Sequence, residues 1–322
     1  MSKKSIVTGI FAVILALAFI ACDSKSNNDE AVEGINGLTM DNYPRVDGST
    51  STDPLNYIVA AKLLGLEYEW INSMGIAAVN FKNNSELPLD FIMKIRCSQT
   101  NGSIIHLIDN ETDLIIVARK MSTDEKQYAD STGVSIIETP IALDALDFII
   151  TPENSVNSLQ VEQIKNIYLG NITNWSEVGG KDISITPFIR NANSGSQEMM
   201  NEIVMGNTGI PDWTIGYADE LRLGSMLLVY SELLGNEHGI CFTPHYYKEY
   251  MVYLVENIKT LAVNGIIPEK ASIKNKTYPF VANVYVSIRS DLDQNSMAYK
   301  LYEWLQTKYG KTVITESGYV PY

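Results

Sequence analysis

Short apolar runs alternate along the chain with longer segments whose apolar residues recur every three or four positions. The first pattern is typical of strands and the second of amphipathic helices. Strands that alternate with helices indicate an α/β chain with largely parallel sheets. The predicted strands are residues 91–95, 114–117, 148–150, 183–189 and 281–288, and the predicted helices are residues 55–64, 159–168, 197–205 and 297–308.

The helix predicted at 159–168 shows how the boundaries are assigned. Asn157 with Gln160 resembles a capping box at its start. Ile164 and Ile167 share one face, and Gly170 can end the helix.

The length, composition and charge exclude several classes of protein. At 322 residues a single apolar core gives way to two, so two lobes are expected. With 45% hydrophobic and 19% charged residues the chain is globular, and it has no long apolar run after residue 21 that would suggest a multi-span membrane protein. A net charge of -14 without a basic cluster argues against a nucleic-acid partner.

The first residues resemble an export signal. Lys3 and Lys4 precede an apolar stretch over residues 6–21, so residues 1–21 are predicted to be a signal peptide. Cys22 stands where a bacterial lipoprotein signal places its lipidated cysteine, although an ordinary cleaved signal with a chance cysteine is the alternative. Residues 22–38 are then a lipid-anchored flexible tether.

Two further cysteines remain in the mature chain. Cys97 and Cys241 permit at most one disulfide in an oxidising compartment. Their separation does not specify a bridge, and we expect both to be small buried apolar residues.

Three junctions between a predicted strand and a predicted helix are rich in hydroxyl groups. They are residues 46–54, 97–103 and 190–196. Helix starts with free N–H groups, serine hydroxyls and a close-approach glycine can bind an oxyanion, and Arg190 adds a planar fork suited to tetrahedral oxygens. The carboxyl ends of parallel strands are also where α/β sheets place ligands. Each turn taken alone could be a simple helix cap.

Candidate catalytic and metal-ligating residues are few. His106, His238 and His245 lack the spacing of zinc ligands, and no nucleophile elbow or phosphate loop occurs. Ser194 and Ser196 have no paired base in the sequence. The chain is therefore predicted not to be an enzyme and to need no metal or cofactor.

Several ordered motifs resemble one family. They are residues 47–50 before Pro54, 163–175 with 178–180, Arg190 with 194–196, 261–265 and 316–321. From about Tyr43 to Tyr322 the chain is similar to the phosphate-binding protein of bacterial phosphate ABC importers, which has a type II periplasmic-binding-protein fold.

The resemblance implies a set of ligand-binding residues. They are Ser49, Thr50, Ser51, Thr100, Arg190, Ser194, Gly195 and Ser196. Two carboxylates that some members bring to the site are missing here, at Ala118 or the adjacent Arg119 and at Ala192. A carboxylate accepts the proton of hydrogen phosphate and repels fully deprotonated oxyanions, so selectivity for phosphate over sulfate is left open.

Other charged residues near these motifs have two interpretations each. Asp47 and Glu198 could be substitute acceptors, or each could be a solvated surface acid or a helix-start charge, which we favour. Arg119 either supplies a second cation or pairs with a surface acid such as Asp124.

The fold implied by the resemblance has two lobes joined by two crossover hinge segments, with the ligand cleft between them. Lobe one is residues 39–138 and 279–322, and lobe two is residues 139–278, with crossings near 138–142 and 278–281.

The function implied is that of a monomeric lipoprotein on the extracytoplasmic face of a bacterial membrane. It would capture inorganic phosphate or a related tetrahedral oxyanion and pass it to an ABC permease. The alternative is an anchored sensory or adhesive lipoprotein that keeps the fold and recognises a partner surface instead.

Overall fold

The computed structural model describes residues 33–322 except for residues 74, 207, 211–214, 217–224 and 254–256. The predicted signal peptide, the predicted lipidation site Cys22 and residues 22–32 of the predicted tether lie outside the described residues. Among the residues that are described, no helix is both long and apolar enough to cross a bilayer.

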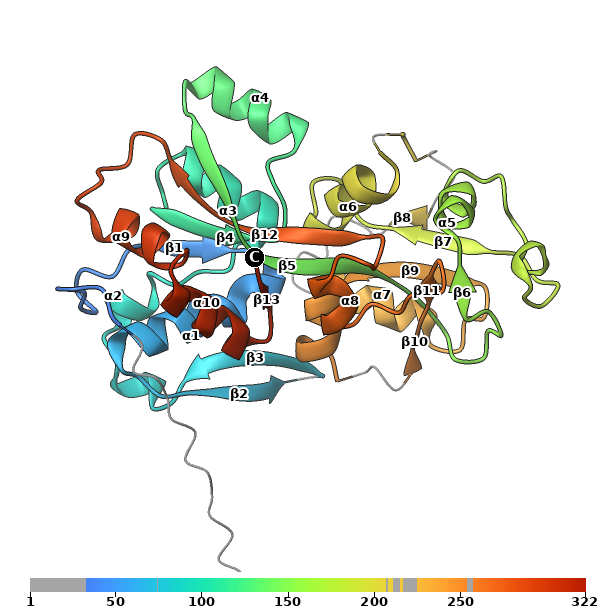
Figure 1. The fold of residues 1–322 in the computed structure, drawn as a ribbon, viewed down its shortest axis with the longest axis horizontal. Coiled ribbons are helices and arrows are strands. Elements are labelled where there is room, and N and C mark those ends of the chain that lie inside the picture. The colour runs from blue at the N-terminus through green and yellow to red at the C-terminus, as the bar shows by residue number, and fades with distance from the viewer. Residues whose placement is uncertain (1–32, 74, 207, 211–214, 217–224, 254–256) are drawn as a thin grey trace, which may run out of the picture. The chain divides into compact units, whose positions relative to one another are not determined.

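Thirteen strands are assigned to the described residues. They are β1 (Val46–Gly48), β2 (Tyr68–Ser73), β3 (Ile76–Phe81), β4 (Leu114–Val117), β5 (Ile136–Ile150), β6 (Ser158–Leu159), β7 (Thr186–Ile189), β8 (Ile215–Gly216), β9 (Gly239–Pro244), β10 (Lys259–Thr260), β11 (Ala262–Val263), β12 (Val281–Arg289) and β13 (Val320–Pro321). The main sheet has the order β1-β4-β12-β5-β9-β7-β8, with β10 and β13 also paired to β5. Figure 1 shows this sheet running through the middle of the unit.

The main sheet is mixed, so the prediction of largely parallel sheets is wrong. β1 pairs with β4 in parallel, as β7 does with β9 and β8. β12 is antiparallel to both β4 and β5, and β5 is antiparallel to β9. The prediction failed because apolar runs show where single strands lie but not which strands pair, and β5 and β12 form a long antiparallel pair.

β5 and β12 join the two ends of this sheet. β5 is 15 residues long and is buried continuously from Ile141 to Ile150. Its first part pairs with β12 and its last part pairs with β9, while β12 also pairs with β4. Both predicted crossings fall on or beside these two strands. The boundaries of the two lobes stay a prediction.

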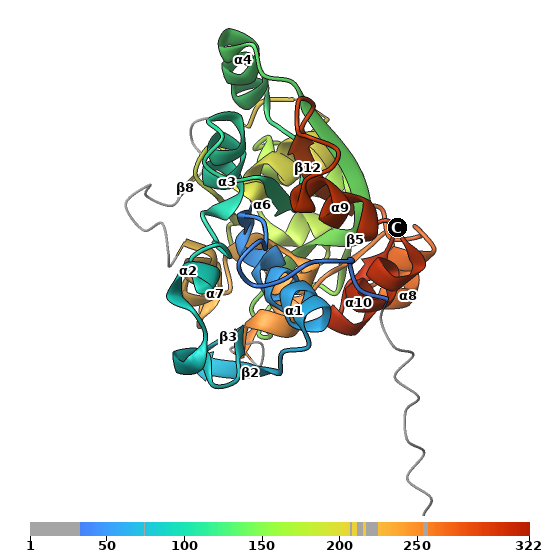
Figure 2. The ribbon, with the colours of Figure 1, turned by 90° about the vertical axis from the view of Figure 1, so that its left-hand side faces the viewer.

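The helices cover the sheet on its faces, as the second view shows (Figure 2). They are α1 (Asp53–Leu64), α2 (Leu89–Ile92), α3 (Gln99–Ile108), α4 (Thr123–Thr132), α5 (Val161–Tyr168), α6 (Gly195–Met199), α7 (Ser225–Leu233), α8 (Lys270–Lys274), α9 (Met297–Trp304) and α10 (Lys308–Ser317). Short 3₁₀ segments are η1 (Thr50–Thr52), η2 (Asn84–Glu86) and η3 (Trp175–Val178), and π-helical turns are η4 (Met200–Val204) and η5 (Tyr247–Met251).

The strand predicted at residues 91–95 is wrong, because α2 ends at Ile92 and a turn follows; only Ile95 forms an isolated parallel bridge, with Val46. Phe91 packs against Tyr43 and Phe81, with ring centroids 5.6 and 5.5 Å away. Leu89 and Met93, four residues apart, are instead 69% and 63% exposed. Residues four apart lie on the same face of a helix, so Leu89 and Met93 share the exposed face while Phe91 packs into the core.

Three helix boundaries also differ from the prediction. At the start of α5 the capping box is formed by Gln160 and Gln163, not by Asn157 and Gln160. The helix predicted at 297–308 is two helices, because α9 ends at Trp304 and α10 begins at Lys308. The helix predicted from residue 197 begins at Gly195 and continues as the π-helical η4.

Aromatic side chains fill much of the core beside β5. Phe148 lies 5.6 to 6.3 Å, centroid to centroid, from the rings of Tyr168, Phe242 and Phe280. Burying one such side chain contributes about 1.5–3 kcal/mol to stability. Cys241 is buried as expected, whereas Cys97 is exposed, which corrects its prediction.

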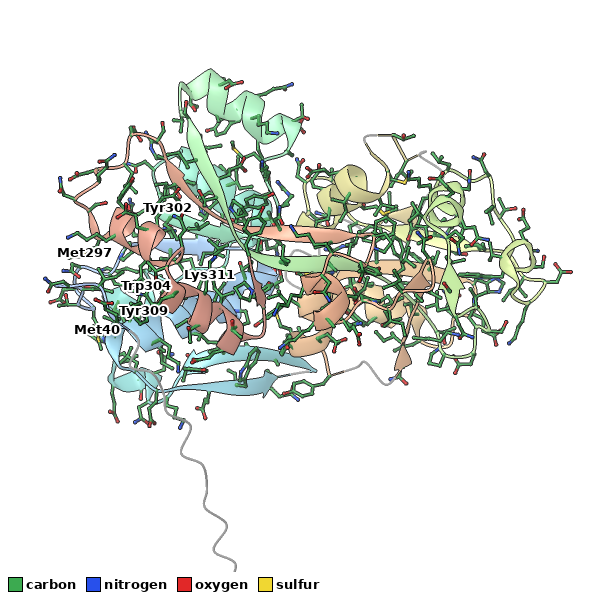
Figure 3. The ribbon with its side chains drawn as sticks, viewed as in Figure 1. Met40, Met297, Tyr302, Trp304, Tyr309 and Lys311 are labelled. Atoms are coloured by element: carbon green, nitrogen blue, oxygen red, sulfur yellow. The ribbon has the colours of Figure 1, made fainter. Side chains whose placement is uncertain are left out.

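The first described residues lie against α9. Trp304 Nε1 donates a hydrogen bond to the carbonyl oxygen of Glu33 at 2.7 Å. Figure 3 shows Met40, Met297 and Trp304 together on this side of the unit. The part of the predicted tether that the structure describes, residues 33–38, therefore starts in contact with α9 at Glu33.

Candidate ligand-binding pocket

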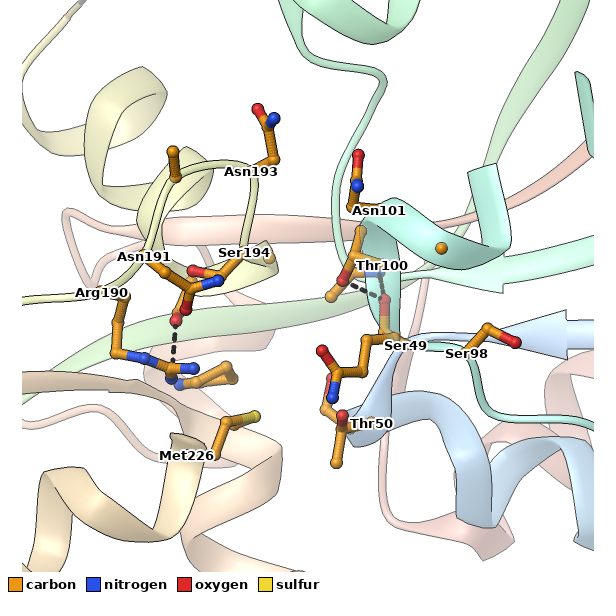
Figure 4. A pocket seen from close by; sticks show the side chains of 18 residues that line it. Ser49, Thr50, Ser98, Thr100, Asn101, Arg190, Asn191, Asn193, Ser194 and Met226 are labelled. Atoms are coloured by element: carbon orange, nitrogen blue, oxygen red, sulfur yellow. Dashed lines mark hydrogen bonds between the residues drawn. The ribbon is translucent and has the colours of Figure 1, made fainter. Parts of the chain in front are cut away.

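The residues predicted to hold a ligand meet at a single cavity. The cavity volume is about 360 Å³. Its lining includes Ser49, Thr50, Ser51, Thr100, Arg190, Ser194, Gly195 and Ser196. We call residues 49–51, 98–102 and 118 the first wall, and residues 190–196, 226 and 244 the second wall. Figure 4 shows the two walls facing each other.

The first wall begins at the tight turn after β1. A Cβ on Gly48 would lie 2.5 Å from the carbonyl oxygen of Ile116 in β4, so only glycine fits there. Thr52 Oγ1 donates to the carbonyl oxygens of Ser49 and Ile116, at 3.0 and 2.5 Å. These contacts fix the hydroxyl-bearing turn to the end of the parallel pair β1 and β4.

Two buried hydroxyl groups form the centre of the first wall. Ser49 Oγ and Thr100 Oγ1 are 2.7 Å apart, and Ser49 Oγ accepts a hydrogen bond from the amide of Ala118 at 3.1 Å. Because one hydroxyl proton joins the two oxygens, the proton of the other remains for a ligand. Thr100 lies in the first turn of α3, which begins at Gln99.

Asp47 is an internal support of the first wall, so its interpretation as a surface acid is wrong. Its side chain is fully buried, and Oδ1 accepts from the amides of Gly48 and Ser98, both at 2.8 Å. Oδ2 lies 2.8 Å from Nδ1 of His106 in α3. Asp47 therefore ties the turn after β1 to the start of α3. Glu198 does lie in the first turn of α6, as we favoured.

The second wall is the segment that connects β7 to α6. Ser194 is the N-cap of α6, and its Oγ accepts from the amide of Gln197 at 3.2 Å. Gln197 in turn accepts from the amide of Arg190 at 2.8 Å, which closes the loop on itself. Arg190 Nη1 donates to Ser196 Oγ at 3.3 Å. The guanidinium and two serine hydroxyls are thus held on one side of the cavity.

The charge of this wall is positive. Burial raises the pKa of the neighbouring Tyr247 phenol to about 12, against the opposing effect of the Arg190 guanidinium. Tyr247 is therefore neutral at physiological pH and does not cancel the charge of Arg190. Among the described lining residues there is no carboxylate.

Arg119 does not reach the cavity, and its partner is Glu125 rather than Asp124. Arg119 Nη1 and Nη2 lie 2.6 and 2.9 Å from the two carboxylate oxygens of Glu125. Both side chains are 2% exposed, so this is a buried bidentate ion pair and not a surface contact.

Some lining residues were not predicted. Gln99, Asn101, Asn191 and Asn193 also line the cavity, and all four could have been found because they stand within the hydroxyl-rich turns. Met226 in α7 and Pro244 at the end of β9 also line it. No local sequence signal connects them to the site.

The sequence matches the model of a known family. A model described as a PBP superfamily domain, the periplasmic-binding-protein-like group, matches residues 74–308. The chain belongs to this superfamily. The match confirms the predicted periplasmic-binding-protein-like family, and with the solved structures described below it confirms the predicted α/β fold of the type II kind.

Two curated proteins are examples of relatives that are similar in sequence. The phosphate-binding protein PstS of Borreliella burgdorferi is 24% identical over 184 residues, which are 57% of this chain and 65% of the relative. Protein SphX of Synechococcus elongatus is 22% identical over 234 residues, which are 70% of this chain and 67% of the relative. The alignments therefore span about two thirds of each relative.

Solved structures show the same PBP fold. A substrate-binding protein assigned to a phosphate ABC transporter of Clostridium perfringens, with bound phosphate, has a TM-score of 0.62 and 20% identity, covering 86% of this chain and 98% of its own. An ABC-type phosphate transport receptor from Vibrio cholerae has a TM-score of 0.59 and 20% identity, with the same coverage. At this identity the likeness establishes the fold.

Proposed function

We propose that this chain is an extracytoplasmic solute-binding protein that captures inorganic phosphate, or a related tetrahedral oxyanion, in the pocket between the two walls. The observation that carries the proposal is that Arg190 and the hydroxyls of both walls face one cavity. Relatives named for phosphate binding support the same ligand class.

The pocket offers the donors that a small anion requires. Hydroxyl groups and a guanidinium can donate to each oxygen of a tetrahedral ion, and a hydrogen bond to a charged group contributes about 1.5–3 kcal/mol net. The chain carries a net charge of -14, so its overall field opposes an anion and these local donors must overcome it. Binding and release require no covalent step, so the proposed role is transport rather than catalysis.

Donors on two walls couple binding to closure. Since a bound ion is fully hydrogen-bonded only when both walls surround it, the ion stabilises the form in which they approach. We propose that lobes of residues 39–138 with 279–322, and of residues 139–278, move about β5 and β12. Residues 1–21 would direct export, Cys22 would carry the lipid anchor, and a monomer would deliver the ion to an ABC permease.

Calorimetric titration of the purified chain with phosphate tests the ligand, and Arg190→Ala tests the site. We expect one ion per chain, and a loss of about 10- to 150-fold in affinity for Arg190→Ala, since a hydrogen bond to a charged group is worth about 1.5–3 kcal/mol. The circular dichroism spectrum should be unchanged. Arg45→Ala is the matched control, because Arg45 pairs with Asp113 away from the pocket lining.

Two results would contradict the proposal. Unchanged phosphate binding by Arg190→Ala would show that the anion does not bind in the pocket beside Arg190. If the wild-type chain showed no thermal shift with phosphate, sulfate, phosphonates or molybdate, the sensory or adhesive alternative would be favoured instead.

A further inference from the structure

A hydrogen bond joins the two walls beside the pocket. Arg119 Nη2 donates to the carbonyl oxygen of Asn193 at 3.0 Å. Arg119 directly follows Ala118 of the first wall, whereas Asn193 belongs to the second wall. The two residues are 74 positions apart in the sequence. This contact therefore depends on how closely the walls approach.

The guanidinium is held rigidly from its own side. Glu125 binds both of its terminal nitrogens, and Arg119 Nη1 also donates to the carbonyl oxygen of Lys120 at 2.7 Å. Glu125 Oε2 accepts from the amide of Ser122 at 2.7 Å, as part of the capping box of α4. Because these contacts all lie within residues 119–125, they persist when the second wall moves away.

The acceptor lies next to residues that face the ligand. Asn193 has a φ of +63°, in the left-handed region, and precedes Ser194, Gly195 and Ser196. A fixed carbonyl at residue 193 therefore fixes the point at which those hydroxyl-bearing residues enter the pocket. Asn193 is half-buried, so separation of the walls would return its carbonyl to water.

We propose that Arg119 is a positioning residue for anion capture: it contacts no ligand, but holds the loop of the second wall against the first wall when the anion is bound. This inference rests on the proposed function. Opening the pocket breaks the bond to Asn193 while the Arg119–Glu125 pair stays intact. Arg119 therefore slows release of the anion and has little effect on its entry.

Two variants test the proposal in the full chain. Arg119→Lys keeps a positive partner for Glu125, but a single ammonium cannot bind both carboxylate oxygens and the carbonyl of Asn193 in the same fork geometry. Arg119→Met with Glu125→Gln removes both charges, leaves no buried unpaired carboxylate and keeps an acceptor in the capping box. The second variant guards against misfolding of the first.

Rapid filtration after a chase of radiolabelled phosphate measures dissociation, and calorimetry measures affinity. We expect both variants to release phosphate about tenfold faster, as for the loss of one hydrogen bond to a charged donor, with association changed less than about twofold. Arg45→Lys is the control, since Arg45 also binds a carboxylate, that of Asp113, through two nitrogens but does not join the walls. Its release rate should equal that of the wild type.

The outcomes separate the two proposals. If the wild-type chain binds phosphate and both Arg119 variants release it at the wild-type rate, the positioning role is wrong and the proposed function stands. Slower association with unchanged dissociation would also overturn the positioning role. If the wild-type chain binds none of phosphate, sulfate, phosphonates and molybdate, the function and this inference both fail.

Discussion

Gly195 and Thr100 approach each other across the pocket so closely that a Cβ on Gly195 would lie 2.5 Å from Thr100 Oγ1. Gly195 is the first residue of α6 on the second wall, and Thr100 lies in α3 on the first. Thr100 is 4% exposed and its hydroxyl is bound to Ser49, so it cannot rotate away without losing that bond. Glycine is therefore required at 195 for the walls to meet.

Substitution Gly195→Ala should weaken phosphate binding while leaving the fold intact. The added methyl group must push the walls apart or displace the Thr100 hydroxyl, and overpacking of this kind costs about 1–3 kcal/mol. We expect a loss of about 5- to 150-fold in affinity by calorimetry. Gly209→Ala is a suitable control, because no atom lies within 4 Å of a Cβ at that glycine. Wild-type affinity in Gly195→Ala would show that the walls need not approach this closely.

Sequence patterns predicted the elements that are defined locally. The helical face of Ile164 and Ile167 is buried in α5 as expected. The 91–95 run was assigned wrongly because a short apolar run fits a strand or a buried helical turn equally well, and the packing of Phe91 on Tyr43 decides between them. Likewise, the antiparallel pairing of β5 with β12 joins segments too far apart for local patterns to reveal.

In the site, too, the sequence predicted local features but not contacts between distant residues. Hydroxyl-rich turns could be found from composition, but the burial of Asp47 depends on the amide of Ser98 and on His106, which are distant in sequence. The partner of Arg119 could have been predicted more closely. Ser122 and Glu125 have the spacing of a capping box, which would have favoured Glu125 over Asp124 as that partner.

Sulfate should compete with phosphate for this pocket. The described lining residues supply hydroxyls, amides and Arg190, and hydroxyl groups can turn to donate to every oxygen of a fully deprotonated ion. We expect competition calorimetry to give affinities for the two ions within about tenfold of each other, a difference of about 1.4 kcal/mol or less. Ala192→Asp should disfavour sulfate, because the added carboxylate repels an ion that has no proton to donate. Rejection of sulfate by the wild type would refute this expectation.

Asp47 should matter for stability more than its single charge suggests. Asp47→Ala leaves the amides of Gly48 and Ser98 without their acceptor, and each unsatisfied buried donor costs about 1–3 kcal/mol. We expect urea unfolding to show a loss of about 2–6 kcal/mol. Asp47→Asn should lose less, since its carbonyl oxygen can still accept from both amides.

A surface variant provides the comparison for Asp47. Glu162 forms an exposed pair with Lys165 one helical turn away, so Glu162→Ala should cost about 0.5 kcal/mol or less. If Asp47→Ala were no more destabilising than this control, the carboxylate would not be the support that ties β1 to α3.

The stability of the fold should fall as pH rises from about 5 to 8. Burial raises the pKa of Asp144 in β5 to about 6, from an ordinary value of 3.8, so the folded chain keeps a proton that the unfolded chain releases. Burial alone would lower the pKa of His245, but its hydrogen bond to Asp147 and the charge of that carboxylate raise it overall. A histidine with a raised pKa also loses its stabilising contribution as pH rises through that value, so both groups act in the same direction.

Asp144→Asn isolates the contribution of the carboxyl group. Asp144 Oδ1 accepts from the amides of Ala145 and Tyr246, both contacts that an asparagine oxygen can keep, so the substitution removes mainly the buried charge. Melting temperatures between pH 5 and 8 should fall less steeply for Asp144→Asn, and at pH 8 it should be more stable than the wild type by on the order of 2 kcal/mol. Asp130→Asn, exposed on α4, should follow the wild-type profile. Parallel pH profiles for Asp144→Asn and the wild type would mean that this carboxyl group titrates at its ordinary pKa in the fold.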